Sequence, residues 1–522
     1  MNNRILNILI DLYAAVFGLL SALVLVVSML TTVVFRRNEQ NDLFDFVPEN
    51  LPLLLCLCAA AAAVLFCLQR KAFFAGSRYG GRFHIGVSGR ILLVFAAACS
   101  LFFILSMRPV PTNDASQLDD IINDFMHGEY GALESGGYLA SYPFQIGYVC
   151  IGQLLYLAFG PSNFLVYQLL NVLSILGTLY CLYRIAEEIS GSEAAEVMGA
   201  LGLGAFVLYI YATFIYNDIW SLFPQTLAMY LQIRYLKTGK VRTEIGAGAA
   251  ISIACFIKTN CIIALIAMVL TLGIRAIRAL PSGKEAVRHL LLALCMIILT
   301  SALSALVKAG YTRAAGLERF PEGVPAAGYL AMGMQEMEGK YGWYDGYNVS
   351  VLHENGNDTQ AASEAACRNI EEQMGHFRDS GRYFVKFYLM KFLSQWADPT
   401  QMSLRELEES VRHTTFPKTV SEFMIFGAGF PVLSWIMNVW HTLMYLGVVL
   451  YMVTWLLRRI HHEPVSDAEA MLVMFILGGM LFHQIWEAAG RYSLRYYVTM
   501  LPLAAYGYER LMTTKLPKGV RS

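Results

Sequence analysis

The sequence is poor in charged residues, and this shortage excludes several classes of protein. Only 15% of the 522 residues are charged, the formal net charge is zero, and 56% of the residues are hydrophobic. Soluble globular domains carry about 25% charged residues, so this chain does not have the composition of one. It also has no basic excess, and nothing in its net charge therefore points to a nucleic-acid partner.

Paired cysteines and cofactor motifs are missing as well. All ten cysteines except Cys367 fall in apolar runs, which is not the pattern of a disulfide framework. Cys56 and Cys58 are two residues apart on a predicted helix, so they point to different sides and form no zinc site. The sequence contains no Walker loop, dinucleotide fingerprint, HExxH motif or internal repeat. ATP-driven transport, redox chemistry and metalloprotease chemistry therefore have no support.

Long apolar segments are what the sequence has instead. A membrane-spanning helix needs about 20 mostly apolar residues, and the first apolar run is too long for the hydrophobic region of a signal peptide. We predict an all-α polytopic membrane protein with about 12 transmembrane helices. The predicted spans are residues 8–34, 51–68, 91–107, 164–183, 197–216, 219–236, 244–257, 259–274, 289–308, 431–457, 469–486 and 493–511.

The loops between these segments alternate in charge. One side collects basic residues, namely Arg70, Lys71, Arg78, Arg82, Arg90, Arg184, Arg234, Lys237, Lys240, Arg242, Arg275, Arg278, Lys284, Arg288, Arg458, Arg459, Arg510, Lys515, Lys518 and Arg521. The other side receives Glu39, Asp42, Asp45, Glu49, Asp114, Asp119, Asp120, Asp124, Glu129 and Glu134. Cytoplasmic loops are enriched in Lys and Arg, so both termini are predicted to be cytoplasmic and the acidic loop 108–163 to lie outside.

Residues 143–159 are apolar enough to span, but counting them would invert the side of every later loop. Pro143 and Gln145 at the start, and Gly160-Pro161 at the end, suit a short interfacial helix. We expect this segment to lie in or dip into the outer leaflet, with a true span as the competing topology.

The chain is predicted to divide into four regions. Residues 1–90 form a transmembrane hairpin and a cytoplasmic loop, and residues 91–308 form a transmembrane module that includes the acidic loop. Residues 309–430 are the one long polar stretch and are predicted to be a large extracytoplasmic segment. Residues 431–522 supply the last transmembrane helices and a cytoplasmic tail.

Ionisable and polar residues near the outer membrane boundary are the candidates for function, because charge there is costly. They are Asp114, Asp119, Asp120, Asn217, Asp218, Lys258, Asn260, His483, Glu487, Arg491 and Arg495. A partly desolvated carboxylate can act as a base, which is the role we assign to Asp114. Lys258, Arg491 and Arg495 match a phosphate, because guanidinium groups bind its oxygens in pairs and lysine supplies a point charge. Together these residues predict a site for a phosphorylated lipid.

Simpler interpretations stand beside these. Asp119, Asp120 and Asp124 recur at near-helical spacing and would also suit the solvated face of a loop helix. Asp218 would serve as the N-cap of the helix that follows it, as a second acid, or as a ligand of a divalent metal shared with phosphate. Arg491 and Arg495 would also suit anchors at the membrane interface.

Four short motifs resemble the membrane glycosyltransferases of the GT-C fold, which include the protein O-mannosyltransferases, the aminoarabinose transferases of lipid A and the oligosaccharyltransferases. The motifs are the outer loop from Pro111-Thr-Asn-Asp114 to Gly147, Tyr216-Asn-Asp218, Ile257-Lys-Thr-Asn260 and Glu487-Ala-Ala-Gly-Arg-Tyr492. The chain lacks the Asp-Glu pair of the mannosyltransferases and the Trp-Trp-Asp signature of the oligosaccharyltransferases. Transfer of an N-glycan to asparagine is therefore not expected.

The resemblance implies a GT-C-like fold with residues 91–308 as the catalytic module. It implies a hexosyltransferase-like enzyme that moves a sugar, with inversion, from a polyprenyl-phosphate donor to a hydroxyl acceptor on a cell-wall polymer, a lipid or a protein. The site would lie at the outer face of the bacterial plasma membrane. Asp114 would take the acceptor proton, while Lys258 and one or both arginines stabilise the departing phosphate. No cofactor is certain, and a divalent metal is left open. The alternative function is a flippase or transporter of polyprenyl-linked glycans.

Overall fold

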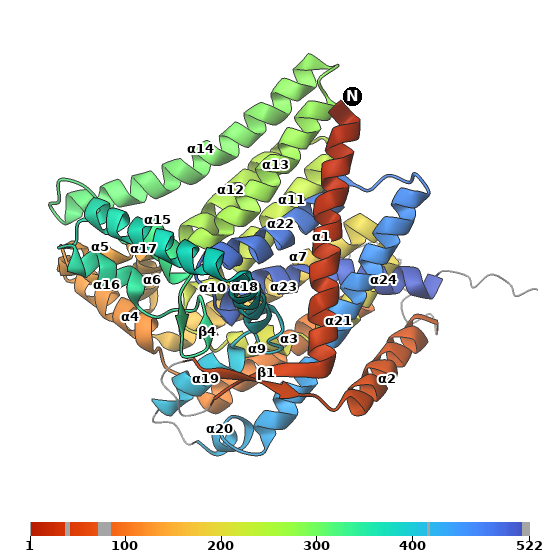
Figure 1. The fold of residues 1–522 in the computed structure, drawn as a ribbon, viewed down its shortest axis with the longest axis horizontal. Coiled ribbons are helices and arrows are strands. Elements are labelled where there is room, and N and C mark those ends of the chain that lie inside the picture. The colour runs from red at the N-terminus through yellow and green to blue at the C-terminus, as the bar shows by residue number, and fades with distance from the viewer. Residues whose placement is uncertain (1, 37–41, 71–84, 415–417, 514–522) are drawn as a thin grey trace, which may run out of the picture.

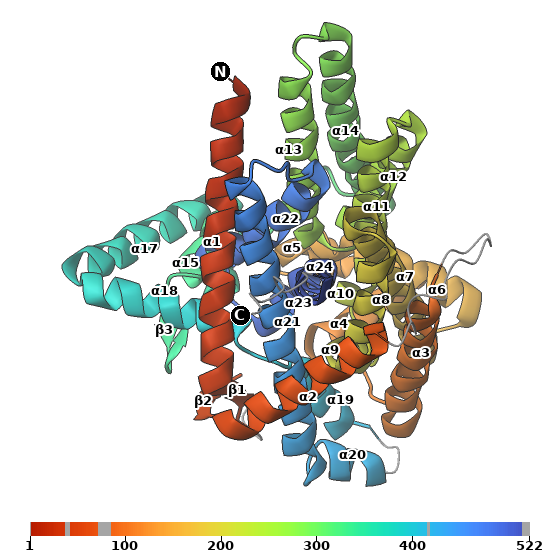
Figure 2. The same ribbon diagram turned by 90° about the vertical axis from the view of Figure 1, so that its right-hand side faces the viewer.

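The computed structural model describes residues 2–36, 42–70, 85–414 and 418–513. Within these ranges the chain is largely helical, with two short two-stranded hairpins. Long helices lie side by side as a bundle, and shorter helices such as α4, α5, α15 and α16 gather at one end of it (Figure 1). In the turned view of Figure 2, α17 and α18 project from one side of the bundle, while α3 and α6 form the opposite side.

The N-terminal part has two helices joined by a hairpin. Its elements are α1 (Asn2–Leu30), β1 (Thr31–Phe35), β2 (Phe44–Pro48) and α2 (Leu51–Arg70). The first span was predicted to reach residue 34, and this boundary is wrong, because the helix ends at Leu30. The following segment, Thr31–Phe35, is rich in β-branched residues, which favour a strand, and it pairs antiparallel with β2.

The middle of the chain contains the acidic loop and the central helices. Its elements are α3 (Val87–Met107), α4 (Asn113–Met126), η1 (Gly131–Leu133), α5 (Tyr138–Ser141), η2 (Pro143–Gln145), α6 (Ile146–Phe159), α7 (Phe164–Ser190), α8 (Ser192–Gly202), α9 (Phe206–Tyr211), α10 (Asn217–Trp220), α11 (Leu222–Thr238), α12 (Val241–Ile257), η3 (Thr259–Cys261), α13 (Ile262–Arg278) and α14 (Gly283–Ala314). The predicted spans 197–216 and 219–236 are both divided, the first into α8 and α9 and the second into α10 and α11. The break after α8 lies at Gly204, where a Cβ would come within 1.9 Å of the Trp440 ring.

The last part begins with the long polar segment. Its elements are α15 (Ala326–Met332), β3 (Glu336–Met337), β4 (Lys340–Tyr341), α16 (Tyr347–Glu354), α17 (Thr359–Asp379), α18 (Gly381–Trp396), α19 (Ser403–Arg412), α20 (Thr419–Met424), α21 (Gly429–Ile460), α22 (Asp467–Ile485), α23 (Gly490–Thr499) and α24 (Leu501–Thr513). A capping box of Ser466 and Glu469 starts α22. The predicted span 493–511 is interrupted at Met500, because Pro502 cannot donate a helical backbone hydrogen bond.

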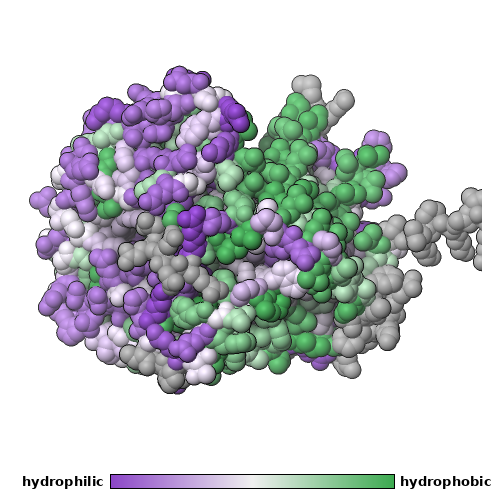
Figure 3. All heavy atoms as spheres, turned by 60° about the horizontal axis from the view of Figure 1, so that its bottom comes forward, coloured by the Kyte–Doolittle hydropathy of each residue, from purple (hydrophilic) through white to green (hydrophobic). Residues whose placement is uncertain are grey.

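Seven helices among the described residues are long and apolar enough to cross a membrane. They are α1 from Ile5 onward, α3, α7, α13 together with η3, α14, α21 and α22. Helix α14 shows this character most clearly, since it exposes Leu290, Leu291, Leu294, Ile298 and Leu306. In Figure 3 apolar residues cover one part of the visible surface and hydrophilic residues another. The all-α membrane fold is confirmed, whereas the count of about 12 crossings and the four-region division stay predictions.

The apolar segment 143–159, whose topology the sequence left open, consists of the η2 turn followed by helix α6. Helix α6 has 14 residues, which at about 1.5 Å per residue is shorter than the roughly 30 Å of a hydrocarbon core. Gly147 at its start lies against the backbone of Phe256 in α12, where a Cβ would be 1.9 Å from the carbonyl oxygen. The short length favours a helix in or on the membrane surface over a span.

Candidate functional site

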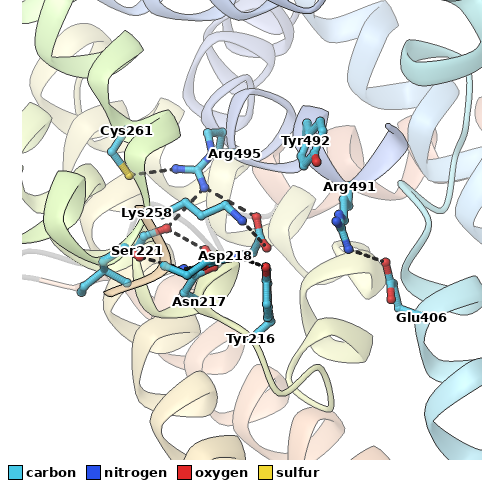
Figure 4. A network of polar contacts seen from close by, with 12 residues as sticks. Tyr216, Asn217, Asp218, Ser221, Lys258, Cys261, Glu406, Arg491, Tyr492 and Arg495 are labelled. Atoms are coloured by element: carbon cyan, nitrogen blue, oxygen red, sulfur yellow. Dashed lines mark hydrogen bonds and ion pairs between the residues drawn. The ribbon is translucent and has the colours of Figure 1, made fainter. Parts of the chain in front are cut away.

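Breaks between helices bring three buried charges together (Figure 4). The Lys258 ammonium donates a hydrogen bond to Asp218 Oδ2 at 3.0 Å, and Arg495 Nη2 lies 3.8 Å from Asp218 Oδ1. Asp218, Lys258 and Arg495 are 4%, 9% and 3% exposed. A buried charge is costly unless it is paired, so these residues form one electrostatic unit.

The local backbone explains how Asp218 and Lys258 reach this place. Lys258 has extended backbone angles directly after α12 and before the η3 turn, so its side chain leaves the helix end. Asp218 lies in the first turn of α10, behind an extended Tyr216. Tyr216 is the N-cap and no side chain caps this helix, so the interpretation of Asp218 as an N-cap is wrong.

Arg495 is held by neutral groups as well as by Asp218. Its Nη1 donates to Gln225 Oε1 at 2.8 Å and to Cys261 Sγ at 2.9 Å, and its Nη2 donates to Ser221 Oγ at 3.3 Å. A guanidinium enclosed in this way is shielded from the surface of the molecule. The interpretation of Arg495 as an interfacial anchor is therefore wrong.

Arg491 lies beside the cluster and brings in a residue that the sequence did not single out. Its Nη1 donates to Glu406 Oε1 on α19 at 3.2 Å, and its guanidinium lies 5.9 Å from the ring of Tyr216 and 5.4 Å from that of Tyr492. The Lys258 ammonium is also 4.7 Å from the Tyr216 ring. These are cation–π distances, so Tyr216 faces two of the cations. No local pattern separates Glu406 from the other acids of α19.

Asp114 lies in the first turn of α4 with its side chain exposed. Its charge acts on the hydroxyl of Tyr138. Its charge also acts on Glu487, which lies between α22 and α23 and is 8% exposed. The pKa of Glu487 is raised to about 7, because burial and the charge of Asp114 together raise it more than Arg491 and Lys258 lower it. The charge of Asp114 thus acts on Glu487 and also on Tyr216, the tyrosine beside two cations of the cluster.

Two further candidates, Asn217 and His483, contact the backbone or side chains next to the charged residues. The Asn217 amide donates to Gln145 Oε1 at 3.2 Å and to the Ile257 carbonyl at 2.8 Å, which ties α10 to η2 and α12. The His483 ring is buried, stacks on Tyr492 at 5.3 Å, and its Nδ1 is 3.3 Å from the Glu487 carbonyl. Both residues hold the backbone that carries charged neighbours.

The remaining candidates are more peripheral. Asp119 accepts a hydrogen bond from Ser162 Oγ at 2.7 Å, and Asp120 is exposed on α4. In the part of the chain that the structure describes, neither contacts the Asp218 cluster. Asn260 is half-buried in the η3 turn.

The surroundings of Asp218 are those of an ion pair and not those of a metal site. Its carboxylate faces Lys258 and Arg495, whereas a divalent cation needs several oxygen ligands. Among the described residues no group of three or more His, Cys, Asp or Glu side chains is placed to hold a metal ion. Asp218 in this arrangement does not fit a metal ligand, and a role for a metal elsewhere stays a prediction.

The fold and this site define a helical membrane protein with a buried, charged centre at its helix breaks. A family profile described as a conserved hypothetical integral membrane protein matches residues 11–512. The chain belongs to that family and is an integral membrane protein. No curated protein matches it significantly.

Solved structures to which the chain is similar include two glycosyltransferases of the GT-C fold, the class that the sequence motifs resemble. One is the oligosaccharyltransferase AglB from Archaeoglobus fulgidus in complex with an inhibitory peptide and a dolichol-phosphate, with a TM-score of 0.42, 15% identity, and coverage of 80% of this chain and 50% of that one. The other is ArnT from Cupriavidus metallidurans bound to undecaprenyl phosphate, with a TM-score of 0.33, 14% identity, and coverage of 81% and 78%. The chain spans about half the length of the oligosaccharyltransferase it matches.

Proposed function

We propose that this chain is a glycosyltransferase that uses a polyprenyl-phosphate-linked sugar, with the cluster around Asp218 as the phosphate site. The observation that carries the proposal is that two cations, Lys258 and Arg495, share the one carboxylate of Asp218, with Arg491 and its partner Glu406 beside them. The ammonium and the guanidinium are largely buried, and an anion beside them would complete their charge. A polyprenyl phosphate supplies that anion on an apolar chain, which suits the exposed apolar faces of the helices.

The chemistry follows from the same charges. As the acceptor oxygen attacks the anomeric carbon, the bond from that carbon to the phosphate oxygen breaks, and the phosphate leaves with an additional negative charge. Lys258, Arg491 and Arg495 stabilise this charge where it develops. Asp114 takes the proton from the acceptor hydroxyl.

We propose further that the site faces the outside of the bacterial plasma membrane, with both termini in the cytoplasm. The support is the charge of the loops, since Arg184, Arg275 and Arg458 lie at helix ends opposite those near Asp114 in the predicted order of spans. The acceptor is a hydroxyl group of a cell-wall polymer, a lipid or a protein.

The test is sugar transfer by the purified full chain in proteoliposomes. Undecaprenyl phosphate carrying a radiolabelled hexose is offered with a cell-envelope extract as acceptor, and both labelled product and released undecaprenyl phosphate are measured. Loss of a general base lowers kcat by roughly 100-fold or more, so we expect this of Asp114→Asn. Asp124→Asn, which changes an exposed acid in the last turn of α4, is the matched control and is expected to keep wild-type kcat.

Wild-type turnover by Asp114→Asn would reject the base assignment. Movement of the intact lipid-linked sugar across the bilayer without bond cleavage would favour the flippase alternative instead. Repeating the wild-type assay with EDTA shows whether a divalent metal takes part.

A further inference from the structure

Lys391 is a buried lysine outside the charged cluster. It lies on α18 with 0% exposure, and its ammonium donates to the backbone carbonyls of Gly333 at 2.5 Å and Trp486 at 2.7 Å. No carboxylate lies within ion-pair distance of it among the residues that the structure describes. The pKa of Lys391 is lowered to about 7, because burial lowers it by more than the charge of Glu487 raises it. The hydrogen bonds to these two carbonyls compensate for the burial of the ammonium.

The two carbonyls belong to the ends of two helices. Gly333 is the C-cap of α15, and Trp486 is the C-cap of α22. Carbonyls at helix C-termini lack intrahelical partners and carry a partial negative charge, and an ammonium offers three donors. Lys391 thus joins the end of a helix in the polar segment 309–430 to the end of an apolar helix of the bundle.

Backbone contacts near β4 also join the polar segment to the turn after α22. The Ala488 amide donates to the Gly342 carbonyl at 2.7 Å, and Trp343 pairs with Ala488 as an isolated parallel bridge. Gly342 has a φ of 67°, and a Cβ there would be 2.6 Å from Lys391 Nζ. Only glycine allows this approach of the β4 end to the ammonium.

The segment held in this way carries candidate site residues. The turn 486–489 connects α22 to α23, with Trp486 fixed by Lys391 and Ala488 fixed by Gly342. Glu487 lies between these two anchors. Arg491 follows directly in the first turn of α23, where it reaches Glu406.

We propose that Lys391 is a positioning residue that fixes the turn 486–489, so that Glu487 faces Asp114 and Arg491 faces the cluster around Asp218. The polar segment from α15 to α18 then helps to position the residues of the site. The importance of Glu487 and Arg491 for transfer rests on the proposed function, whereas the fixing of the turn is independent of it.

The experiment compares Lys391→Met with wild type by hydrogen–deuterium exchange of the purified full chain in detergent micelles. Methionine has a similar length but no donor. We expect amides of residues 484–492 to exchange at least ten times faster, with α17 and α18 unchanged. Arg382→Met removes an exposed cation from the same helix and is the matched control, for which exchange stays as in wild type. Lys391→Arg, which keeps charge and donors, is expected to recover part of the protection.

A transfer assay adds a readout that a purely structural role would not give. We expect kcat of Lys391→Met to fall about tenfold while KM for the lipid-linked sugar changes less than threefold, because Lys258 and Asp218 stay in place. Unchanged exchange at 484–492 would overturn the proposal, and so would faster exchange spread over α15 to α18. A loosened turn in a protein whose wild type shows no transfer would support the positioning role and reject the proposed function. If Lys391→Met yields no monodisperse protein, Lys391→Gln is measured instead, with intermediate exchange at 484–492 expected and wild-type exchange overturning the idea.

Discussion

Replacing Lys258 by methionine should reveal whether this ammonium serves the protein fold, the phosphate, or both. It is the nearer of the two cations beside Asp218, at 3.0 Å against 3.8 Å for Arg495. Removing one member of a buried ion pair costs about 3 to 5 kcal/mol, because the other charge stays buried. Arg495 still compensates Asp218 in part, so we expect Lys258→Met to lose about 3 kcal/mol of unfolding free energy.

The double variant Asp218→Asn with Lys258→Met separates the two roles. It removes both the Lys258 ammonium and the Asp218 carboxylate, so no unpaired buried carboxylate remains. The unfolding free energy should therefore return to within about 1 kcal/mol of wild type. One positive and one negative charge are lost, and the net charge of the cluster is therefore the same as in wild type. What remains missing is the contact from the ammonium to a phosphate, worth about 2 kcal/mol for a hydrogen bond between charged groups. That is roughly a 30-fold increase in Kd.

Two measurements on the same preparations check these values. Thermal unfolding in detergent gives the stability of wild type, both single variants and the double variant, and titration with undecaprenyl phosphate followed by native mass spectrometry gives the Kd. The expected result is a double variant with near wild-type stability and weakened binding. Wild-type binding by the double variant would refute the phosphate role of Lys258, and wild-type stability of Lys258→Met would refute the ion-pair reasoning.

Two further predictions concern the turn at Glu487 and the start of α6. Burial raises the pKa of Glu487 to about 7, above its unfolded value of about 4.3, so its contribution to stability is present at low pH and is lost as the pH rises through 7. As the pH rises from 4.5 to 8, the unfolding free energy of Glu487→Gln should therefore increase by about 3 kcal/mol relative to that of wild type. Thermal unfolding measured across this pH range checks the difference, and parallel profiles for the two proteins would contradict it. In Gly147→Ala the new methyl group would lie 1.9 Å from the Phe256 carbonyl oxygen, and overpacking of this kind costs about 1 to 3 kcal/mol. An unchanged Tm would show that α6 is not packed tightly on α12.

The helices could be predicted from the sequence because their signal is local. A run of apolar residues that is long enough to span, with Arg or Lys at one end, can be recognised without knowing the fold. Helices α3, α7 and α14 each contain their predicted range, and α7 and α14 extend beyond it. Boundaries were less secure where packing decides them. The strand at Thr31–Phe35 depends on pairing with β2, and the break at Gly204 on contact with Trp440.

The list of charged candidates was likewise available from the sequence, since ionisable residues stand out near apolar runs. Their partners were not. Asp218 and Lys258 are 40 residues apart in the chain, and Arg491 meets Glu406 across 85 residues. Lys391 gave no signal at all, because nothing in its neighbourhood shows that two distant carbonyls enclose it.

The sequence by itself therefore determined the membrane class, the main helices and which residues were candidates for chemistry. Only the tertiary structure decided that Asp218 is an ion-pair partner of Lys258, that Glu406 belongs to the site, and that Lys391 anchors the turn at 486–489. The physical reason is that hydrophobicity and helix formation act over a few neighbouring residues, whereas burial and charge pairing depend on which distant segments the fold brings into contact.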